Sequence, residues 1–217
     1  MQNRVDFDSE DEYLHRISVK IIETIQMELG KKDFCSIVLS GGNTPRKIYP
    51  YLLKYDVDWK KIYFFWSDER YVNYDNPLSN YGIAKTYFLD HIDYNRENVF
   101  NFRFLPSILD SKSCFELKLN SFLSNTQDGF DISILGMGID GHTASIFNTK
   151  GLNDNVIITS KEDECFKRIS LGINILNLSR TIVLLTNEEK LKIYDSSKSY
   201  PVNFLNKNKT LIYNLRQ

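Results

Sequence analysis

The side chains best suited to chemistry lie together in one short stretch of the chain. Asp140, His142, Thr143 and Ser145 fall within six positions, among three glycines and just after the apolar run Ile132–Leu135. That run has the length of a buried strand. Imidazoles titrate near neutral pH and can transfer protons, and a neighbouring carboxylate can orient the ring or balance its charge. The stretch therefore predicts an acid–base site at the carboxyl end of a strand.

His142 differs from the other two histidines in its setting. His15 falls on the face of a predicted helix and His91 falls near a helix end, so both are interpreted as structural. No serine or cysteine has the setting of a nucleophile elbow, and one histidine beside one aspartate gives too few ligands for zinc. We therefore expect acid–base catalysis by His142 with Asp140 beside it, with no metal and no cofactor.

The same glycines formally match a dinucleotide-binding fingerprint. Gly136–Gly141 reads G-x-G-x-x-G after a strand, and acids follow at Glu162–Glu164. Three observations argue against this interpretation. Asp140 would repel a pyrophosphate from inside the loop, Asn148–Asn155 has the composition of a turn rather than of a crossover helix, and the motif lies in the middle of the chain. We do not expect a nicotinamide or flavin cofactor.

A second glycine turn has the features of an anion site. The sequence S-G-G-N-T-P follows a predicted buried strand and contains Gly41 and Gly42. Thr44 is the expected cap and Pro45 the expected first residue of a helix that continues over Arg46–Tyr55. Backbone N–H groups and the helix dipole at such a turn can hold a phosphate. A plain turn between strand and helix is the alternative, and the paired glycines favour phosphate.

Charged residues follow another predicted strand, Lys61–Trp66. The run Asp68-Glu69-Arg70 could be a solvated salt bridge, which is the usual state of such residues. Its place after a second strand, however, favours a charged wall at the same mouth of the sheet.

The order of the predicted elements sets the fold class. Strands alternate with helices, which predicts an α/β fold: a doubly wound, mainly parallel sheet with helices on both faces. No repeat or domain boundary is visible, so we expect a single domain over residues 1–217. The expected strands beyond those already named are Phe34–Leu39, Asn98–Phe100, Val156–Thr159, Arg168–Leu171, Thr181–Thr186 and Lys209–Leu215. The expected helices are Glu10–Leu29, Ser79–His91, Ser113–Leu123, Gly172–Leu178 (a short helix or turn) and Asn187–Ser196.

Composition excludes several classes of partner. A net charge of −1 gives no reason to expect nucleic acid or an anionic membrane as a partner. No apolar run approaches the roughly 20 residues of a membrane span. The acidic N-terminus does not resemble a signal or transit peptide, so the cytoplasm is the expected location. Cys35, Cys114 and Cys165 are far apart, and we expect three buried, reduced thiols.

Four motifs in order carry a family resemblance. They are Ser40–Pro45, Ser67–Val72, Ser79–Tyr81 and Leu135–Phe147. Together they resemble the 6-phosphogluconolactonase family over nearly the whole chain. The resemblance implies a doubly wound fold related to glucosamine-6-phosphate deaminase (NagB/RpiA-like). It also implies metal-free hydrolysis of 6-phospho-D-glucono-1,5-lactone to 6-phosphogluconate in the oxidative pentose phosphate pathway.

The resemblance also implies roles for individual residues. His142 would act in the proton transfers of ring opening, with Asp140 beside it. Backbone N–H groups of the Gly136–Gly141 loop would be candidates for stabilising the oxyanion. The residues implied to bind the phosphate or the sugar are Gly41, Gly42, Thr44, Arg70, Arg168 and, with a weaker claim, Lys190.

Some positions depart from the family pattern. The segment E-D-E-C-F-K replaces a proline-rich approach to Arg168, and Asn187 stands where glycine is common before Lys190. These departures put the role of Lys190 in doubt more than that of His142. The family also occurs fused to glucose-6-phosphate dehydrogenase, which makes that enzyme a possible partner.

Two other functions remain as alternatives. The first is glucosamine-6-phosphate deaminase, an isomerase on a related scaffold, but Thr143–Asn148 lacks the carboxylate expected after its G-H motif. The second is a non-catalytic sugar-phosphate sensor, which would keep the phosphate loops and lose the acid–base pair.

Overall fold

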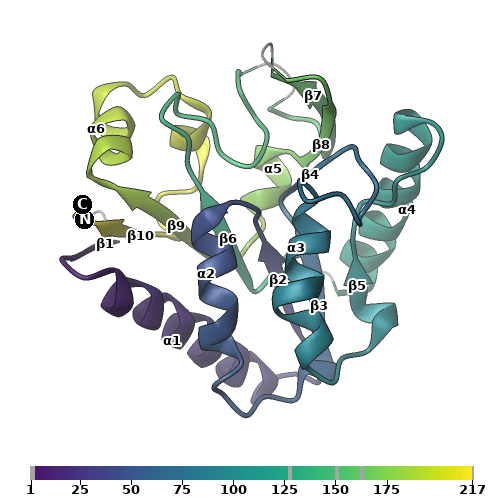
Figure 1. The fold of residues 1–217 in the computed structure, drawn as a ribbon, viewed down its shortest axis with the longest axis horizontal. Helices are drawn as coiled ribbons and strands as arrows, with labels where there is room; N and C mark the ends of the chain where they lie inside the picture. Colours follow the sequence, from purple (N-terminus) through teal and green to yellow (C-terminus); the bar gives the residue numbers. More distant parts are fainter. Residues whose placement is uncertain (1–2, 127–128, 150–151, 162–163, 217) are drawn as a thin grey trace.

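The computed structural model describes residues 3–126, 129–149, 152–161 and 164–216. Within these residues a seven-stranded parallel sheet has the order β1-β10-β9-β6-β2-β3-β5, and a smaller antiparallel sheet has the order β4-β8-β7 (Figure 1). The strands are β1 (Asn3–Phe7), β2 (Cys35–Leu39), β3 (Ile62–Trp66), β4 (Asp68–Arg70), β5 (Val99–Phe100), β6 (Ile132–Gly136), β7 (Val156–Ser160), β8 (Lys167–Leu171), β9 (Thr181–Asn187) and β10 (Thr210–Leu215). The helices are α1 (Glu10–Leu29), α2 (Asn43–Leu52), α3 (Asn80–Tyr87), α4 (Ile108–Thr126), α5 (Ile173–Leu176) and α6 (Glu188–Ser196).

The large sheet has helices on both faces, as its sequence pattern predicts. Successive side chains of a strand point to opposite faces. In β3, Phe64 packs against Phe88 beside α3, whereas Phe65 packs against Phe122 of α4. The rings of Phe64, Phe65 and Phe88 are fully buried, and that of Phe122 is 5% exposed. The α/β, mainly parallel fold class is therefore confirmed.

The central strands bring two predicted site loops together. β2 pairs with β6 in parallel, with Ile37 opposite Ile132. Every residue of β2 is buried, as expected for a strand covered on both faces. Because parallel strands end at the same edge, the loop after β2 and the loop after β6 meet there.

The N-terminal strand β1 is not predicted from the sequence. It lies at the sheet edge and pairs only with β10, and of its five residues only Phe7 is buried. A short edge strand with one neighbour needs few apolar residues, so its sequence looks like a polar terminus.

The start of α2 differs from the prediction. The helix begins at Asn43 and ends at Leu52, rather than covering Arg46–Tyr55. Its N-cap is Gly42, and no side chain caps it, so the prediction that Thr44 is the cap was wrong. Gly42 has a φ of 100°, which glycine adopts readily, and this turn lets the helix start earlier.

The small antiparallel sheet is also unpredicted. β7 and β8 were expected as strands, but they do not join the large sheet: β8 pairs with β7 on one side and with β4 on the other. The run Asp68–Arg70 is therefore a strand and not a loop. Asp68 and Glu69 are buried, which rules out the solvated salt bridge.

Smaller differences concern helix ends and thiols. α3 ends at Tyr87 and a separate 3-10 turn, η2 (Leu89–His91), follows it, while α4 is longer than predicted. Cys35 is buried, but Cys114 is only partly buried and Cys165 is exposed, so the expectation of three buried thiols was wrong.

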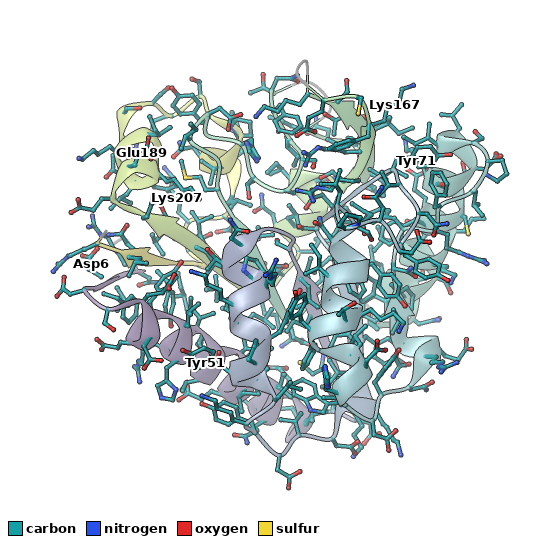
Figure 2. The ribbon with its side chains drawn as sticks, viewed as in Figure 1. Asp6, Tyr51, Tyr71, Lys167, Glu189 and Lys207 are labelled. Carbon is teal, nitrogen blue, oxygen red and sulfur yellow. The ribbon has the colours of Figure 1, made fainter. Side chains whose placement is uncertain are left out.

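The three residues Lys167, Glu189 and Lys207, labelled in Figure 2, are exposed polar side chains on the outside of the molecule. Among the described residues, no helix is both long and apolar enough to cross a membrane.

Candidate active site

A cavity of about 220 Å³ lies where β2, β6 and β9 end. Seven of the eight residues predicted for the site line it: Gly41, Gly42, Thr44, Arg70, His142, Arg168 and Lys190. The eighth, Asp140, lies next to the imidazole of His142. The topology thus gathers residues from positions 41 to 190 into one small volume.

His142 and Asp140 form a direct pair. Nδ1 of His142 is hydrogen-bonded to Oδ1 of Asp140, and the imidazole side chain is 25% exposed. Burial alone would raise the pKa of Asp140, but the charge of His142 and its hydrogen bonds outweigh this and lower that pKa. An ionised Asp140 accepts a hydrogen bond from Nδ1–H. In the neutral imidazole, Nε2 then carries the free lone pair. Within the described residues, no further acidic, cysteine or histidine side chain joins this pair in a group that could hold a metal ion.

The loop that carries His142 is fixed on several sides. The amide of Gly138 donates to the carbonyl oxygen of His142 at 2.9 Å, and the hydroxyl of Thr143 donates to the carbonyl of Gly136 at 2.9 Å. Ala144 has a φ of 50°, a left-handed conformation that is uncommon outside glycine and clusters at functional sites. Ser145 donates to Asp68 at 2.5 Å. Thr143 and Ser145 therefore hold the loop in place.

Hydrogen bonds within this loop exclude two of its amides as donors to an oxyanion. The amide of Gly138 is used by His142, and the amide of Gly141 donates to the carbonyl of Gly138 at 3.1 Å. Neither N–H is free for an oxyanion, contrary to the expectation for the whole Gly136–Gly141 loop. The amide of Asp140 bonds its own carboxylate, and neither Ile139 nor Asp140 is among the residues that line the cavity.

The first turn of α2 supplies amides without helical partners. The first four N–H groups of a helix have no acceptor within it, and their dipole favours an anion. Asn43 and Thr44 stand in this turn and both line the cavity. The structure thus brings the start of α2 next to His142, although its cap differs from the predicted one.

Lys190 enters the cavity from α6. Asn187 caps this helix by accepting the amide of Lys190 at 3.1 Å, so an asparagine at this position supports the helix start. The ammonium group has no hydrogen bond or ion pair within the described residues. Burial lowers the pKa of Lys190 more than the nearby Glu189 carboxylate raises it. A half-buried ammonium without a partner gains from binding an anion.

Arg70 also retains free binding capacity. Its Nη1 donates to the carbonyl of Leu78 at 2.6 Å, but its buried Nε has no partner in the part of the chain that the structure describes. An unsatisfied buried donor in a cavity is a candidate ligand contact.

Arg168 is held more tightly than the prediction assumed. Its Nε and Nη2 donate to Glu164 at 2.9 and 2.6 Å, and Nη1 donates to Ser145 at 3.3 Å. Asp68 lies 3.8 Å from Nη1. Two carboxylates thus offset its charge, which leaves Lys190 and Arg70 as the cations with more capacity for a phosphate.

Asn80 is a site residue that the prediction missed. It was interpreted only as part of a helix start, yet its side chain lines the cavity. Nδ2 donates to the carbonyl of Asp68 at 2.8 Å, and the buried Oδ1 has no partner. That oxygen can accept a hydrogen bond from a sugar hydroxyl. The S-N-Y motif was the available signal, because Asn80 follows the capping Ser79.

Glu69 turns away from this cavity. Its carboxylate accepts the amides of Arg70, Asn80 and Tyr81 and the hydroxyl of Ser79. Burial raises the pKa of Glu69 to about 7, although these hydrogen bonds lower it. Glu69 therefore fixes the start of α3, while Asp68 and Arg70 on either side of it face the site.

We expect Gly41→Ala to impair ligand binding. A Cβ at Gly41 would lie 1.7 Å from Oδ1 of Asn80, so the Asn80 side chain must move away from the cavity. The Michaelis constant for the substrate of this cavity should rise about ten-fold or more, which corresponds to a loss of roughly 1.4 kcal/mol of binding free energy. Steady-state kinetics would measure this rise. Gly30→Ala is the control, because a Cβ there makes only ordinary contacts, and an equal effect in both variants would contradict the role of Gly41.

Comparisons with known proteins identify the family of this chain. Residues 8–212 match the family model described as glucosamine-6-phosphate isomerases/6-phosphogluconolactonase. A 6-phosphogluconolactonase from Thermotoga maritima is 32% identical over 195 residues, which cover 88% of this chain and 87% of that protein. One from Synechocystis is 32% identical over 182 residues, covering 79% of this chain and 74% of that protein. The chain belongs to this family of sugar-phosphate enzymes.

Solved structures agree with the fold. The crystal structure of 6-phosphogluconolactonase from Thermotoga maritima has a TM-score of 0.87 at 29% identity, covering 99% of this chain and 100% of that one. A monomeric glucosamine-6-phosphate deaminase has a TM-score of 0.83 at 18% identity, covering 100% of this chain and 97% of that one. The second comparison bears on the fold alone.

Proposed function

We propose that this chain hydrolyses 6-phospho-D-glucono-1,5-lactone to 6-phosphogluconate. The observation that carries the proposal is the cavity shared by His142, which is bonded to Asp140, a helix start and a lysine that has no partner among the described residues. The lysine and the helix start suit a phosphate, and the imidazole suits proton transfer. The relatives named 6-phosphogluconolactonase support this choice of substrate.

In the proposed reaction, His142 activates water directly. Nε2 takes a proton from a water molecule, and the resulting hydroxide attacks the lactone carbonyl carbon. Asp140 holds the ring through Nδ1 and balances the charge of the imidazolium that forms. No metal ion is needed to generate this nucleophile.

The second half of the reaction returns the same proton. The tetrahedral oxyanion collapses, the bond between the carbonyl carbon and the ring oxygen breaks, and the imidazolium protonates that oxygen. One water is thereby added across one ester bond. Oδ1 of Asn80 is the candidate acceptor for a sugar hydroxyl.

We expect Lys190→Met to raise the Michaelis constant for the phosphorylated lactone about ten-fold, with a smaller change in kcat. The ammonium is proposed to contact the phosphate, which takes no part in bond breaking, so its loss weakens binding more than chemistry. Lys192→Met is the matched control, because Lys192 lies exposed on the same helix.

The substrate proposal is tested by comparing the two lactones that differ only in the phosphate. Wild-type protein should prefer 6-phosphogluconolactone over glucono-1,5-lactone, and Lys190→Met should reduce that preference. Equal turnover of both lactones by wild type would show that the cavity does not recognise a phosphate.

A further inference from the structure

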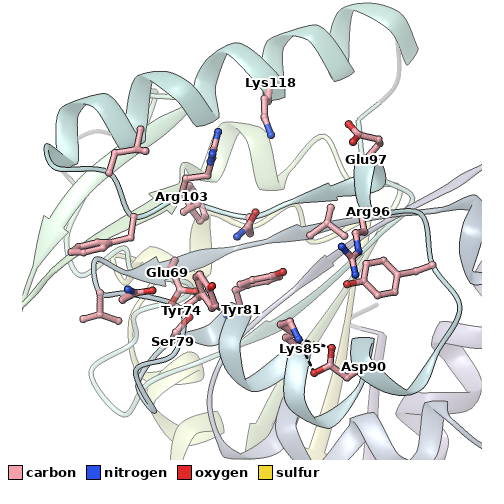
Figure 3. A pocket seen from close by; sticks show the side chains of 18 residues that line it. Glu69, Tyr74, Ser79, Tyr81, Lys85, Asp90, Arg96, Glu97, Arg103 and Lys118 are labelled. Carbon is pink, nitrogen blue, oxygen red and sulfur yellow. Dashed lines mark hydrogen bonds and ion pairs between the residues drawn. The ribbon is translucent and has the colours of Figure 1, made fainter.

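A larger cavity lies outside the candidate active site, at the open edge of the large sheet. Its volume is about 690 Å³, within the range of sites for small molecules. It lies between α3 and α4, beside the edge strand β5 (Figure 3). We call it the edge cavity and define it by six of its lining residues: Glu69, Tyr81, Tyr94, Arg96, Arg103 and Lys118.

Three cations of the edge cavity have no partner among the described residues. Arg96 belongs to the 3-10 turn η3 (Arg96–Asn98), Arg103 to the segment after β5, and Lys118 to α4. None of the three side chains makes a hydrogen bond or ion pair within the described residues. Lys118 reaches from α4 toward the cavity, and Arg103 reaches toward that helix (Figure 3).

The acidic side chains of the edge cavity do not balance these cations. Asp90 is already paired with Lys85, at 2.6 Å between Oδ1 and Nζ. The carboxylate of Glu69 is taken up by the start of α3. Glu97 is therefore the carboxylate that remains to oppose three cations. Arginine and lysine gathered without counter-charges are typical of sites for phosphate groups.

Aromatic rings form the other part of the wall. Tyr81 and Tyr94 are partly buried, and Tyr74 is 59% exposed while its ring meets that of Tyr81 edge to face at 6.3 Å. Such rings give a planar ligand a surface for stacking at little cost in side-chain entropy. A cavity with both cations and rings suits a ligand that carries both phosphates and a planar base.

We propose that the edge cavity binds a nucleoside polyphosphate. Arg103 and Lys118 hold the phosphates, and the tyrosine wall holds the base. The site is separate from the active site, since β4 divides the two: Glu69 lines the edge cavity, whereas Asp68 and Arg70 line the active-site cavity. The proposal does not depend on the lactone reaction.

Isothermal titration calorimetry on the wild-type chain tests this proposal with three probes: ADP, inorganic pyrophosphate and adenosine. ADP should bind, and pyrophosphate and adenosine should each bind at least about ten-fold more weakly. The double variant Arg103→Gln/Lys118→Gln should weaken ADP binding about ten-fold or more. Neither side chain bonds another part of the chain that the structure describes, so thermal unfolding of the variant should match that of wild type. Lys207→Gln, an exposed lysine elsewhere, should leave ADP binding unchanged.

A competition experiment separates the two cavities. ADP affinity should be unchanged by saturating 6-phosphogluconate and by the Lys190→Met substitution. The proposal is overturned if wild type does not bind ADP, if the double variant binds it as tightly as wild type, or if 6-phosphogluconate displaces it. Pyrophosphate binding as tight as that of ADP would also overturn it, because the tyrosine wall would then have no role.

Discussion

Replacing His142 by alanine should lower kcat for the phosphorylated lactone by about 10²- to 10⁴-fold, the usual contribution of a positioned general acid–base. The physical reason is that Asp140 holds Nδ1, which in the proposed mechanism leaves Nε2 to take the proton of the attacking water. Alanine removes that acceptor and also the proton donor for the ring oxygen. The Michaelis constant should change much less, since the proposed phosphate contacts at the start of α2 and at Lys190 of α6 are untouched.

The matched control for this variant is His91→Ala. His91 is exposed and its ring bonds only the carbonyl of Thr86, at 3.1 Å within the described residues. Rate measurements should show near-wild-type turnover for His91→Ala. Circular dichroism should show the native fold for both His91→Ala and His142→Ala. Near-normal turnover by His142→Ala would exclude the proposed base.

The second large effect concerns stability. Asp131→Ala should lower the free energy of unfolding by about 3–5 kcal/mol, the usual effect of removing one partner from a buried ion pair. Asp131 is fully buried, and its carboxylate accepts the amide and hydroxyl of Ser36 at 2.8 and 3.0 Å and the ammonium of Lys32 at 2.7 Å. Arg180 lies 3.6 Å away. The substitution takes this acceptor away from the buried amide and hydroxyl of Ser36 in β2.

Urea denaturation followed by fluorescence would measure this loss. Asp93→Ala is the control: its salt bridge with Lys60 is largely exposed, at 80% for the aspartate side chain, and exposed pairs contribute about 0–1 kcal/mol. Similar losses in both variants would contradict the structural role of Asp131. Asp131 lies at the amino end of β6, away from the cavity, so its effect should appear in stability rather than in kcat.

The parallel sheet could be predicted because its strands carry a strong signal. β2, β6 and β9 are predominantly apolar runs that end near glycine or asparagine turns. This pattern indicates strands that are covered on both faces. β1 could not be predicted, because an edge strand needs one buried side chain and its sequence looks polar. The pairing of β4 with β8 joins residues about 100 positions apart, and no local pattern carries that information.

The residues that form the site could be predicted better than the contacts between them. The glycine turns and the G-H motif located Gly41, Gly42 and His142, which the topology then brings into one cavity. The approach of Arg168 to Asp68 could not be foreseen, since it depends on how β8 pairs with β4. Asn80 was missed because a residue after a helix cap is usually interpreted as part of the helix.

The central claim is that this chain hydrolyses 6-phosphogluconolactone, and lactone clearance tests it most directly. Freshly generated lactone would be coupled to 6-phosphogluconate dehydrogenase, with NADPH formation followed against spontaneous hydrolysis. We predict that wild type accelerates clearance well above the blank and that His142→Ala falls back toward it. A wild-type rate equal to the blank, with the protein folded, would contradict the claim.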